Sequence, residues 1–345
     1  MTLIYFIIIL GVTLTVHEFG HFLFAKKSGI YCYEFSIGMG PKLHEWHRKG
    51  DETVYVLRLF PIGGYVSMAG EDVEVDEDIP EDKRMQSKPW HQRFLTIVAG
   101  VMFNFILAIV LLFIIALISG APTNRPIIDT IEKGYDVTDS GLKKGDLIVG
   151  LNGDKIVNAD DFMLKLQVSA GEEITLKVKR GDKYHDVTFA PKKVKVDGQE
   201  GYKYGFSLSG KTTHGVLAAI QYAFEKTWSL LRQMALIIYY LATGQLSLSS
   251  LAGPIGIFTI IGESAKAGIL NLVYLTAYIS INVGFINLLP IPAFDGGRLF
   301  FLIVEKIKGS PVDAKFENTV HAIGFILLMI LMVFITYNDI VRLFQ

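Results

Sequence analysis

Four long apolar runs divide the chain into membrane-crossing and polar segments. As a helix, each run is long enough to cross about 30 Å of hydrocarbon. The first carries no lysine or arginine before Lys26 and is longer than the core of a signal peptide, which predicts a retained span. The pattern predicts four transmembrane spans, at residues 2–25, 94–119, 267–304 and 317–340, and the uncharged cores of the last two are 267–291 and 320–337.

A fifth helix-length segment, 216–243, is apolar only in patches. It carries Glu225, Lys226 and Arg232 among several tyrosines and Trp228. Charges are costly at the centre of a bilayer, whereas charged and aromatic side chains suit its interface. The pattern predicts a helix that lies on the membrane surface, followed by a loop at 244–257 that leads into the next membrane element.

The polar segment 28–93 holds most of the basic residues that lie close to span ends. Under the positive-inside rule this segment faces the cytoplasm and the N-terminus lies outside. Within it, residues 53–70 alternate like two paired strands around a turn at 61–64, and an acidic, flexible loop is expected to follow through Asp82. The pattern predicts a small membrane-associated β-hairpin.

A second polar segment, 122–210, is rich in strand-like stretches and contains the phrase GLKKGDLIVGLNGDKI at 141–156. It resembles a PDZ domain of the bacterial, circularly rearranged kind, in which the peptide-binding strand and its carboxylate loop come last. The resemblance assigns that role to 204–210, with Tyr204, Gly205 and Phe206 as peptide-binding residues. A PDZ domain captures an extended peptide as an added strand. A small β-rich spacer is the alternative.

These segments predict a polytopic α-helical membrane protein with four transmembrane helices, a β-rich extracytoplasmic PDZ-like domain and a small membrane-associated β-hairpin. The expected domains are a first half of a membrane core (1–121), the PDZ-like domain (122–210) and a second half of the core (211–345). The composition agrees, because 51% of the residues are hydrophobic and only 19% are charged. The net charge of −1 offers no nucleic-acid surface, and the single cysteine, Cys32, excludes an internal disulfide.

The chemistry-bearing residues begin with the HEFGH motif in the first span. On a helix His17 and His21 lie one above the other, so both imidazoles can reach one metal, and Glu18 beside them can hold an attacking water. Three ionisable side chains inside an otherwise uncharged span are costly to bury in lipid, which favours a functional site. A helix-packing role for the histidines is the alternative.

A catalytic zinc needs a third protein ligand and an open position for water. The strongest candidate is Asp295, which follows the third apolar run in the sequence NLLPIPAFDGG. Pro290 and Pro292 prevent a regular helix there, and broken backbone at membrane depth is tolerated only where it faces protein or a watery cavity. A helix-end residue at the headgroups is the alternative for Asp295.

Topology gives an independent check on this pairing. His17 and His21 lie near the cytoplasmic end of a span that runs inward, and Asp295 follows its own span. The two stretches meet only if both spans run inward, which requires one outward crossing between them. The span 94–119 supplies that crossing, so 216–243 is expected to stay on the membrane surface.

The HEFGH motif, the PDZ-like insert, GPIG at 253–256 and NLLPIPAFDGG together resemble the site-2 protease family of intramembrane zinc metalloproteases, in particular its bacterial branch with the regulator of sigma-E protease. The match extends over essentially the whole chain, although only one PDZ-like unit is evident where some relatives carry two. The resemblance implies Zn²⁺ as cofactor. The residues it implies are His17, His21 and Asp295 as zinc ligands, Glu18 as catalytic residue, and Asn287, Gly63, Gly64 and Tyr65 as substrate-binding residues.

The resemblance also implies partners and a location. The substrates would be single-pass membrane proteins, such as anti-sigma factors already trimmed outside or remnant signal peptides, met within the lipid bilayer. The chain would lie in the bacterial inner membrane, with both termini and the PDZ-like domain extracytoplasmic and the active site near the cytoplasmic side.

Two other classes of function compete with the protease. A non-catalytic membrane scaffold could use the PDZ-like unit to bind partner tails, but it would not need Glu18 beside three metal ligands. A metal transporter would need a polar path through several spans, and the other spans offer only His321 as an obvious ionisable group. The remaining histidines are expected to be surface or structural residues.

Overall fold

The structure is a computed structural model that describes residues 1–71, 78–196 and 199–344. It divides into two compact units. Met1–Leu111 together with Leu248–Gln345 form the membrane unit, and Leu112–Ser247 form the insert unit. The acidic loop expected after Gly70 falls largely on residues 72–77, which lie outside the described residues.

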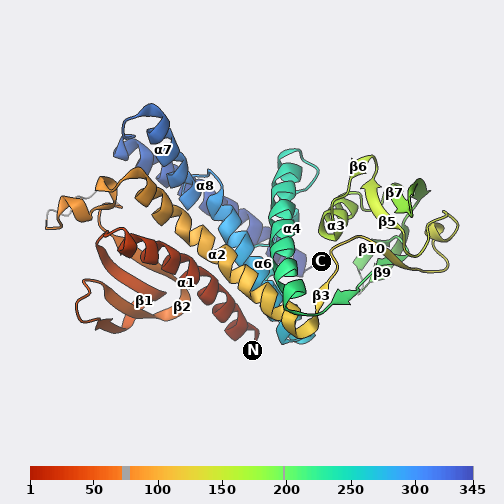
Figure 1. Ribbon diagram of the computed structural model, residues 1–345, viewed down its shortest axis with the longest axis horizontal. Helices are drawn as coiled ribbons and strands as arrows, with labels where there is room; N and C mark the ends of the chain where they lie inside the picture. Colours follow the sequence, from red (N-terminus) through yellow and green to blue (C-terminus); the bar gives the residue numbers. More distant parts are fainter. Residues whose placement is uncertain (72–77, 197–198, 345) are drawn as a thin grey trace. The chain divides into compact units, whose positions relative to one another are not determined.

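Long helices form most of the membrane unit, because in lipid a helix satisfies every backbone polar group within itself. Figure 1 shows α1, α2 and α6 as long helices tilted in a similar direction. The helices are α1 (Thr2–Lys27), α2 (Trp90–Ser119, which continues into the insert unit), α5 (Pro254–Ala267), α6 (Ile269–Leu288), α7 (Asp295–Lys308) and α8 (Ala314–Leu343).

Five described helices are long and apolar enough to cross a membrane: Thr2–Lys27, Trp90–Ser119, Leu248–Ala267, Ile269–Leu288 and Ala314–Arg342. Four of them fall on the predicted spans. The fifth falls partly on 244–257, where a loop was expected, and that expectation is wrong from Pro254 onward. Proline suits the first position of α5, where its missing N–H leaves no helical bond unmade. With 14 residues, α5 itself reaches about 21 Å.

The third predicted span, 267–304, consists of two helices rather than one. Helix α6 ends at Leu288 and α7 begins at Asp295. The two prolines between them interrupt the helical hydrogen bonds, as the sequence predicts. The interruption places Asp295 in the first turn of a new helix inside the membrane unit.

The polar segment after α1 forms β1 (Cys32–His47) and β2 (Val54–Met68), which pair with each other. The prediction of a hairpin within 53–70 is wrong, because β2 is one continuous strand and its two ends do not pair with each other. Instead Phe35 of β1 pairs with both Tyr55 and Val66, so the first part of β1 lies between the two arms of β2. The apolar alternation had indicated strands, but it could not identify their partner.

Burial raises the pKa of the Cys32 thiol to about 12. The side chain is fully buried among Phe22, Phe35 and other apolar residues of the membrane unit. A protonated, inaccessible thiol is neither a metal ligand nor a nucleophile, so Cys32 acts as a packing residue.

The insert unit is a small β-rich body with two helices, α3 (Ala159–Val168) and α4 (Val216–Ala242). Its main sheet has the strand order β6-β5-β7-β8, and β11 pairs with β4 in a second sheet. Apolar side chains from both sheets and α3 form one core. The strands are β3 (Ala121–Pro122), β4 (Ile128–Ile131), β5 (Leu147–Leu151), β6 (Asp154–Lys155), β7 (Ile174–Arg180), β8 (Lys183–Phe189), β9 (Lys192–Val196), β10 (Gln199–Lys203), β11 (Phe206–Leu208) and β12 (Thr212–Thr213).

Helix α4 has two unlike faces. Its charged face meets α3: Lys226 Nζ lies 2.6 Å from Asp160 Oδ1, the Ser229 hydroxyl donates to the same carboxylate, and Arg232 lies 3.8 Å from Asp161. The opposite face carries exposed apolar side chains three or four residues apart: Leu217, Ile220, Phe224 and Trp228. The two cations of α4 are therefore neutralised within the insert unit, and its apolar stripe is exposed.

Candidate active site

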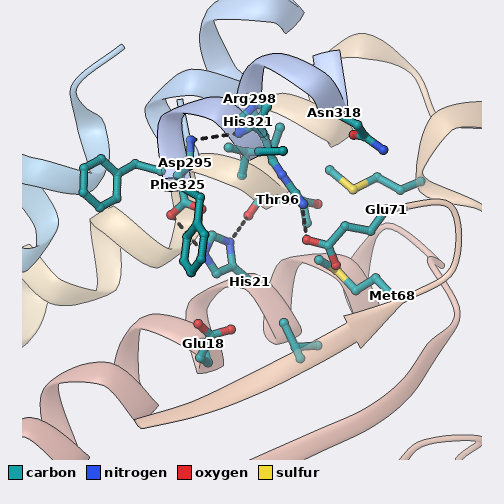
Figure 2. A pocket seen from close by; sticks show the side chains of 16 residues that line it. Glu18, His21, Met68, Glu71, Thr96, Asp295, Arg298, Asn318, His321 and Phe325 are labelled. Atoms are coloured by element: carbon teal, nitrogen blue, oxygen red, sulfur yellow. Dashed lines mark hydrogen bonds and ion pairs between the residues drawn. The ribbon is translucent and has the colours of Figure 1, made fainter. Parts of the chain in front are cut away.

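Two histidines of α1 and an aspartate of α7 meet in the membrane unit. The Nε2 atoms of His17 and His21 lie 3.2 Å apart. Oδ2 of Asp295 lies 3.0 Å from the first nitrogen and 3.2 Å from the second. Both histidines are buried. Residues 278 positions apart in sequence thus converge on one point, as Figure 2 shows for His21 and Asp295.

The far side of each imidazole has its own partner. Nδ1 of His21 lies 2.8 Å from the carbonyl oxygen of Thr96, which can only accept, so this nitrogen carries the hydrogen. Nδ1 of His17 lies 3.2 Å from the side-chain amide of Asn104, whose Oδ1 is buried without a partner. A rotation of that amide by 180° exchanges its oxygen and nitrogen, so that Oδ1 of Asn104 accepts a hydrogen bond from Nδ1–H of His17. Both rings then present a lone pair at Nε2.

These contacts test whether zinc fits the site. Two imidazole lone pairs and a carboxylate oxygen face one another at 3.0–3.2 Å, and Oδ2 of Asp295 is buried without a hydrogen bond. Three acceptors in this arrangement repel one another unless a cation lies between them. Ligand atoms around a tetrahedral zinc, each about 2.0–2.1 Å from the metal, are about 3.3 Å apart. The donor set and its spacing therefore fit Zn²⁺.

Close helix packing makes room for the two imidazoles. A Cβ on Gly100 of α2 would overlap Nε2 of His21 and would lie 2.8 Å from Cε1 of His17. One turn along the contact, a Cβ on Gly20 of α1 would collide with the backbone of Ala99. Only glycine at both positions lets the backbones of α1 and α2 approach this closely. These glycines cannot be identified from the sequence, because nothing in the local pattern distinguishes them.

Several contacts hold Asp295 at its place. The glycines that follow it allow a tight turn: a Cβ on Gly297 would lie only 2.7 Å from the carbonyl oxygen of Ile291. Farther along α7, Trp90 of α2 donates from Nε1 to the carbonyl of Leu302 at 2.8 Å. Arg93 of α2 forms an ion pair with Glu305 at 2.7 Å. Because α2 also packs against α1, it positions both parts of the triad.

A cavity of about 480 Å³ opens beside the triad. Glu18, His21 and Asp295 line it together with Val66 and Met68 of β2. In Figure 2 the Glu18 carboxylate extends from α1 toward His21 and Asp295. A carboxylate, three groups that can bind a metal and a partly open cavity are thus brought together.

None of the predicted substrate-binding residues is among the described residues that line this cavity. Gly63 and Gly64 lie on β2 beside α1, where the Thr15 hydroxyl donates to the Gly63 carbonyl at 3.2 Å. Tyr65 donates from its hydroxyl to Glu34 at 2.7 Å, and burial together with this bond raises the pKa of Tyr65. Asn287 donates to Val283 of its own helix at 2.9 Å. Their contacts with a substrate stay a prediction.

In the insert unit, Tyr204, Gly205 and Phe206 are at or just before β11. Phe206 packs against Phe162 of α3, with ring centroids 6.1 Å apart. Tyr204 is buried, and its hydroxyl donates to the carbonyl of Ser169 at 2.9 Å. The segment lies next to α3, but the buried position of Tyr204 suits a core residue better than a surface contact. Peptide binding there stays a prediction.

Comparison with known proteins gives the site its context. Residues 5–331 match the model of "Peptidase family M50". The chain belongs to peptidase family M50. It is 34% identical to "Regulator of sigma-W protease RasP" of Bacillus subtilis (strain 168), over 99% of both chains. It is 32% identical to "Zinc metalloprotease RasP" of Geobacillus kaustophilus (strain HTA426), over 99% of this chain and 98% of the relative, and 34% identical to "Putative zinc metalloprotease SA1105" of Staphylococcus aureus (strain N315), over 100% and 99%.

The family membership settles the class of the protein. The chain is a zinc metalloprotease of the site-2 protease type, its cofactor is Zn²⁺, and its apolar helices make it a multi-pass membrane protein. The resemblance inferred from the motifs is thus confirmed. The scaffold and transporter hypotheses lose their basis, because neither accounts for a peptidase family match over nearly the whole chain.

Proposed function

We propose that this protease hydrolyses peptide bonds within or next to the transmembrane helices of other membrane proteins. The observation that carries the proposal is the position of the triad. His17 and His21 lie in a helix long and apolar enough to cross the bilayer, and Asp295 begins the helix that follows another such helix. A substrate that enters this site from the lipid would meet the metal ligands below the membrane surface.

The chain's own residues divide the chemistry between them. His17, His21 and Asp295 would hold the zinc, which when bound acts as a Lewis acid toward the peptide carbonyl and water. Glu18 accepts a proton from the attacking water and delivers it to the nitrogen of the leaving amine. The carbon–nitrogen bond breaks, and a carboxylate and an amine are the products.

A spanning helix hides its peptide bonds, so a substrate must unwind before cleavage. We propose that β2 receives the unwound segment, because Val66 and Met68 of this strand line the cavity. An extended peptide can add to a strand through backbone hydrogen bonds. Gly63, Gly64 and Tyr65 would then contact the substrate, and Asn287 would hold its backbone if its side chain rotates away from Val283.

The substrates and the location follow from the same proposal. Single-pass membrane proteins, such as trimmed anti-sigma factors or remnant signal peptides, leave one helix that can unwind into the site. The B. subtilis relative bears the name of a sigma-W regulator, which is compatible with the first class. We place the chain in the bacterial inner membrane, with the insert unit and both termini outside and the site toward the cytoplasm.

The PDZ-like role of the insert unit belongs to the proposal too. The edge strand β11 runs next to α3, and in a PDZ domain a C-terminal peptide adds as a strand beside such a helix. The Tyr204–Gly205–Phe206 segment would receive the peptide carboxylate, with Phe206 and Gly205 as the contacts that its geometry favours.

Mapping the cut tests the proposed activity. The purified protein and a single-pass substrate are placed together in liposomes, and the new termini of the products are identified by mass spectrometry. We expect cleavage inside the hydrophobic segment or within a few residues of its end. Cleavage only in the soluble domains, far from the segment, would contradict an intramembrane site.

The meeting of His17 and Asp295 also restricts the topology. The number of crossings between α1 and α6 must be odd, and α2 supplies one. Helices α4 and α5 must therefore either both cross the membrane or both leave it uncrossed. The ion pairs that tie α4 to α3, the exposed apolar stripe of α4 and the short length of α5 favour an arrangement in which neither crosses completely.

A reporter fused after Thr243 distinguishes the two arrangements. Thr243 lies between α4 and α5, so we expect the reporter on the extracytoplasmic side, as for one inserted in the β7–β8 turn of the insert unit. An alkaline phosphatase fusion is active only outside, and a green fluorescent protein fusion, which fluoresces only inside, serves as the reciprocal measurement. A cytoplasmic reporter after Thr243 would mean six crossings rather than four.

A further inference from the structure

The cavity beside the triad has a second wall, formed by α7 and α8, that carries its own polar groups. Three side chains of this wall can donate hydrogen bonds: Arg298, Asn318 and His321. Arg298 is paired with Glu71 across the cavity, and Asn318 is exposed. His321 differs from both, because its Nε2 atom is buried and has no hydrogen-bond partner among the described residues.

The structure fixes which nitrogen of His321 carries hydrogen. The backbone N–H of Ala293 donates to Nδ1 at 3.0 Å, so Nδ1 presents a lone pair. A neutral imidazole has one hydrogen, which must then lie on Nε2. His321 is therefore a hydrogen-bond donor at Nε2, the opposite of the two zinc-binding histidines, whose Nε2 atoms act as acceptors.

The surroundings hold this donor in one orientation. Ala293 adopts a φ of +80°, which is unfavourable for a residue with a side chain, and its N–H is thereby directed at the ring. A Cβ on Gly297 would lie 3.1 Å from Cε1 of His321, so the ring packs directly against the turn that carries Asp295. Phe301 packs on it with centroids 5.9 Å apart. A strained backbone that orients a donor without a partner indicates a group reserved for a ligand.

The chemistry of the cavity identifies that ligand group. During peptide hydrolysis, water adds to the carbonyl carbon and the carbonyl oxygen gains negative charge before the carbon–nitrogen bond breaks. We propose that Nε2–H of His321 donates a hydrogen bond to the carbonyl oxygen of the scissile peptide and stabilises this charge. Glu18 and the two histidines then act from α1, and His321 acts from α8.

Two substitutions separate hydrogen-bond donation from Nε2 of His321 from the structural role of Nδ1, which accepts from Ala293. In His321→Asn the amide oxygen lies near the original position of Nδ1, so it can still accept from Ala293, but no donor reaches the position of Nε2. In His321→Gln an amide N–H lies near the position of Nε2, and the acceptor for Ala293 is lost. We expect kcat to fall about 10²- to 10³-fold in the asparagine variant. The kcat of the glutamine variant is expected to be at least about ten times higher than that of the asparagine variant.

Zinc content and KM complete the measurement. Both variants are expected to keep wild-type zinc, measured by mass spectrometry of the metal, and a KM within about threefold of wild type. Thr319→Val on the same helix is the matched control, because this exposed hydroxyl bonds only to Lys315 of its own helix in the described contacts. An asparagine variant as active as the glutamine variant, or a loss that follows zinc content, would overturn the proposal.

The inference rests on the proposed use of the cavity for peptide hydrolysis, but its test is independent of where the substrate comes from. The variants are compared on a single-pass protein in liposomes and on an unstructured peptide in detergent. If wild type cuts only the free peptide, the intramembrane function fails, whereas the ratio between the glutamine and asparagine variants still decides the role of His321.

Discussion

Replacing Glu18 by glutamine is expected to lower peptide-bond hydrolysis by about 10²- to 10⁴-fold, the range that a positioned general base contributes. Glutamine keeps the size of the side chain and its place beside the cavity, but it cannot accept a proton from water. The metal site should survive, because Glu18 is not one of the three residues whose ligand atoms converge. The measurement is the rate at which a single-pass substrate is cut in liposomes, together with zinc per protein chain.

Glu263→Gln is the matched control for this experiment. Glu263 is an exposed carboxylate on α5, so the same chemical change there should leave the rate within about twofold of wild type. A Glu18→Gln protein that cuts at more than a tenth of the wild-type rate would remove Glu18 from the proton transfer.

Replacing Asp295 by alanine is expected to lower zinc affinity by more than about 100-fold. Substitution of residues that only orient a metal ligand already costs about 10- to 100-fold, and this change removes a ligand atom itself. It leaves two imidazoles, which lie 3.2 Å apart at Nε2. The measurement is metal retained after dialysis against a chelator of known affinity, followed by the cleavage rate at saturating zinc.

The control for the metal site is Asp313→Asn. Asp313 caps α8 by accepting from the N–H of Phe316 at 2.8 Å, and asparagine caps helices equally well. We expect unchanged zinc and unchanged cleavage. An Asp295→Ala protein that retains stoichiometric zinc under these conditions would show that the third ligand lies elsewhere.

The local patterns predicted the elements of the site more reliably than their partners. The i, i+4 histidines and the proline break before Asp295 are properties of neighbouring residues, so both could be read directly. The alternation in 53–70 likewise indicated a strand. Its pairing with β1 joins it to a separate segment of the chain, with partners from 7 (His47 and Val54) to 36 (Cys32 and Met68) positions apart, and a turn at 61–64 was the wrong inference. The loop expected at 244–257 failed at Pro254 for a local reason, because proline also begins helices.

The residues around the triad could not be found in the same way. Thr96 contributes only a backbone carbonyl to His21, and any residue type has one. Asn104 and Gly100 lie in an apolar helix with no motif, and only the approach of α2 to α1 gives them a role. His321 was visible as an ionisable group within a span, but its sequence position did not reveal that Ala293 fixes its tautomer.

The sequence by itself determined four of the five long apolar helices, the histidine pair with its glutamate, and the broken helix that bears the aspartate, because each depends on residues that are neighbours along the chain. The tertiary structure alone decided that α2 packs closely enough to orient both imidazoles, that β2 borders the cavity, and that His321 lines it with Nδ1 held by Ala293. Such relations depend on distances between segments far apart in the chain, and those distances are set by close packing rather than by local pattern.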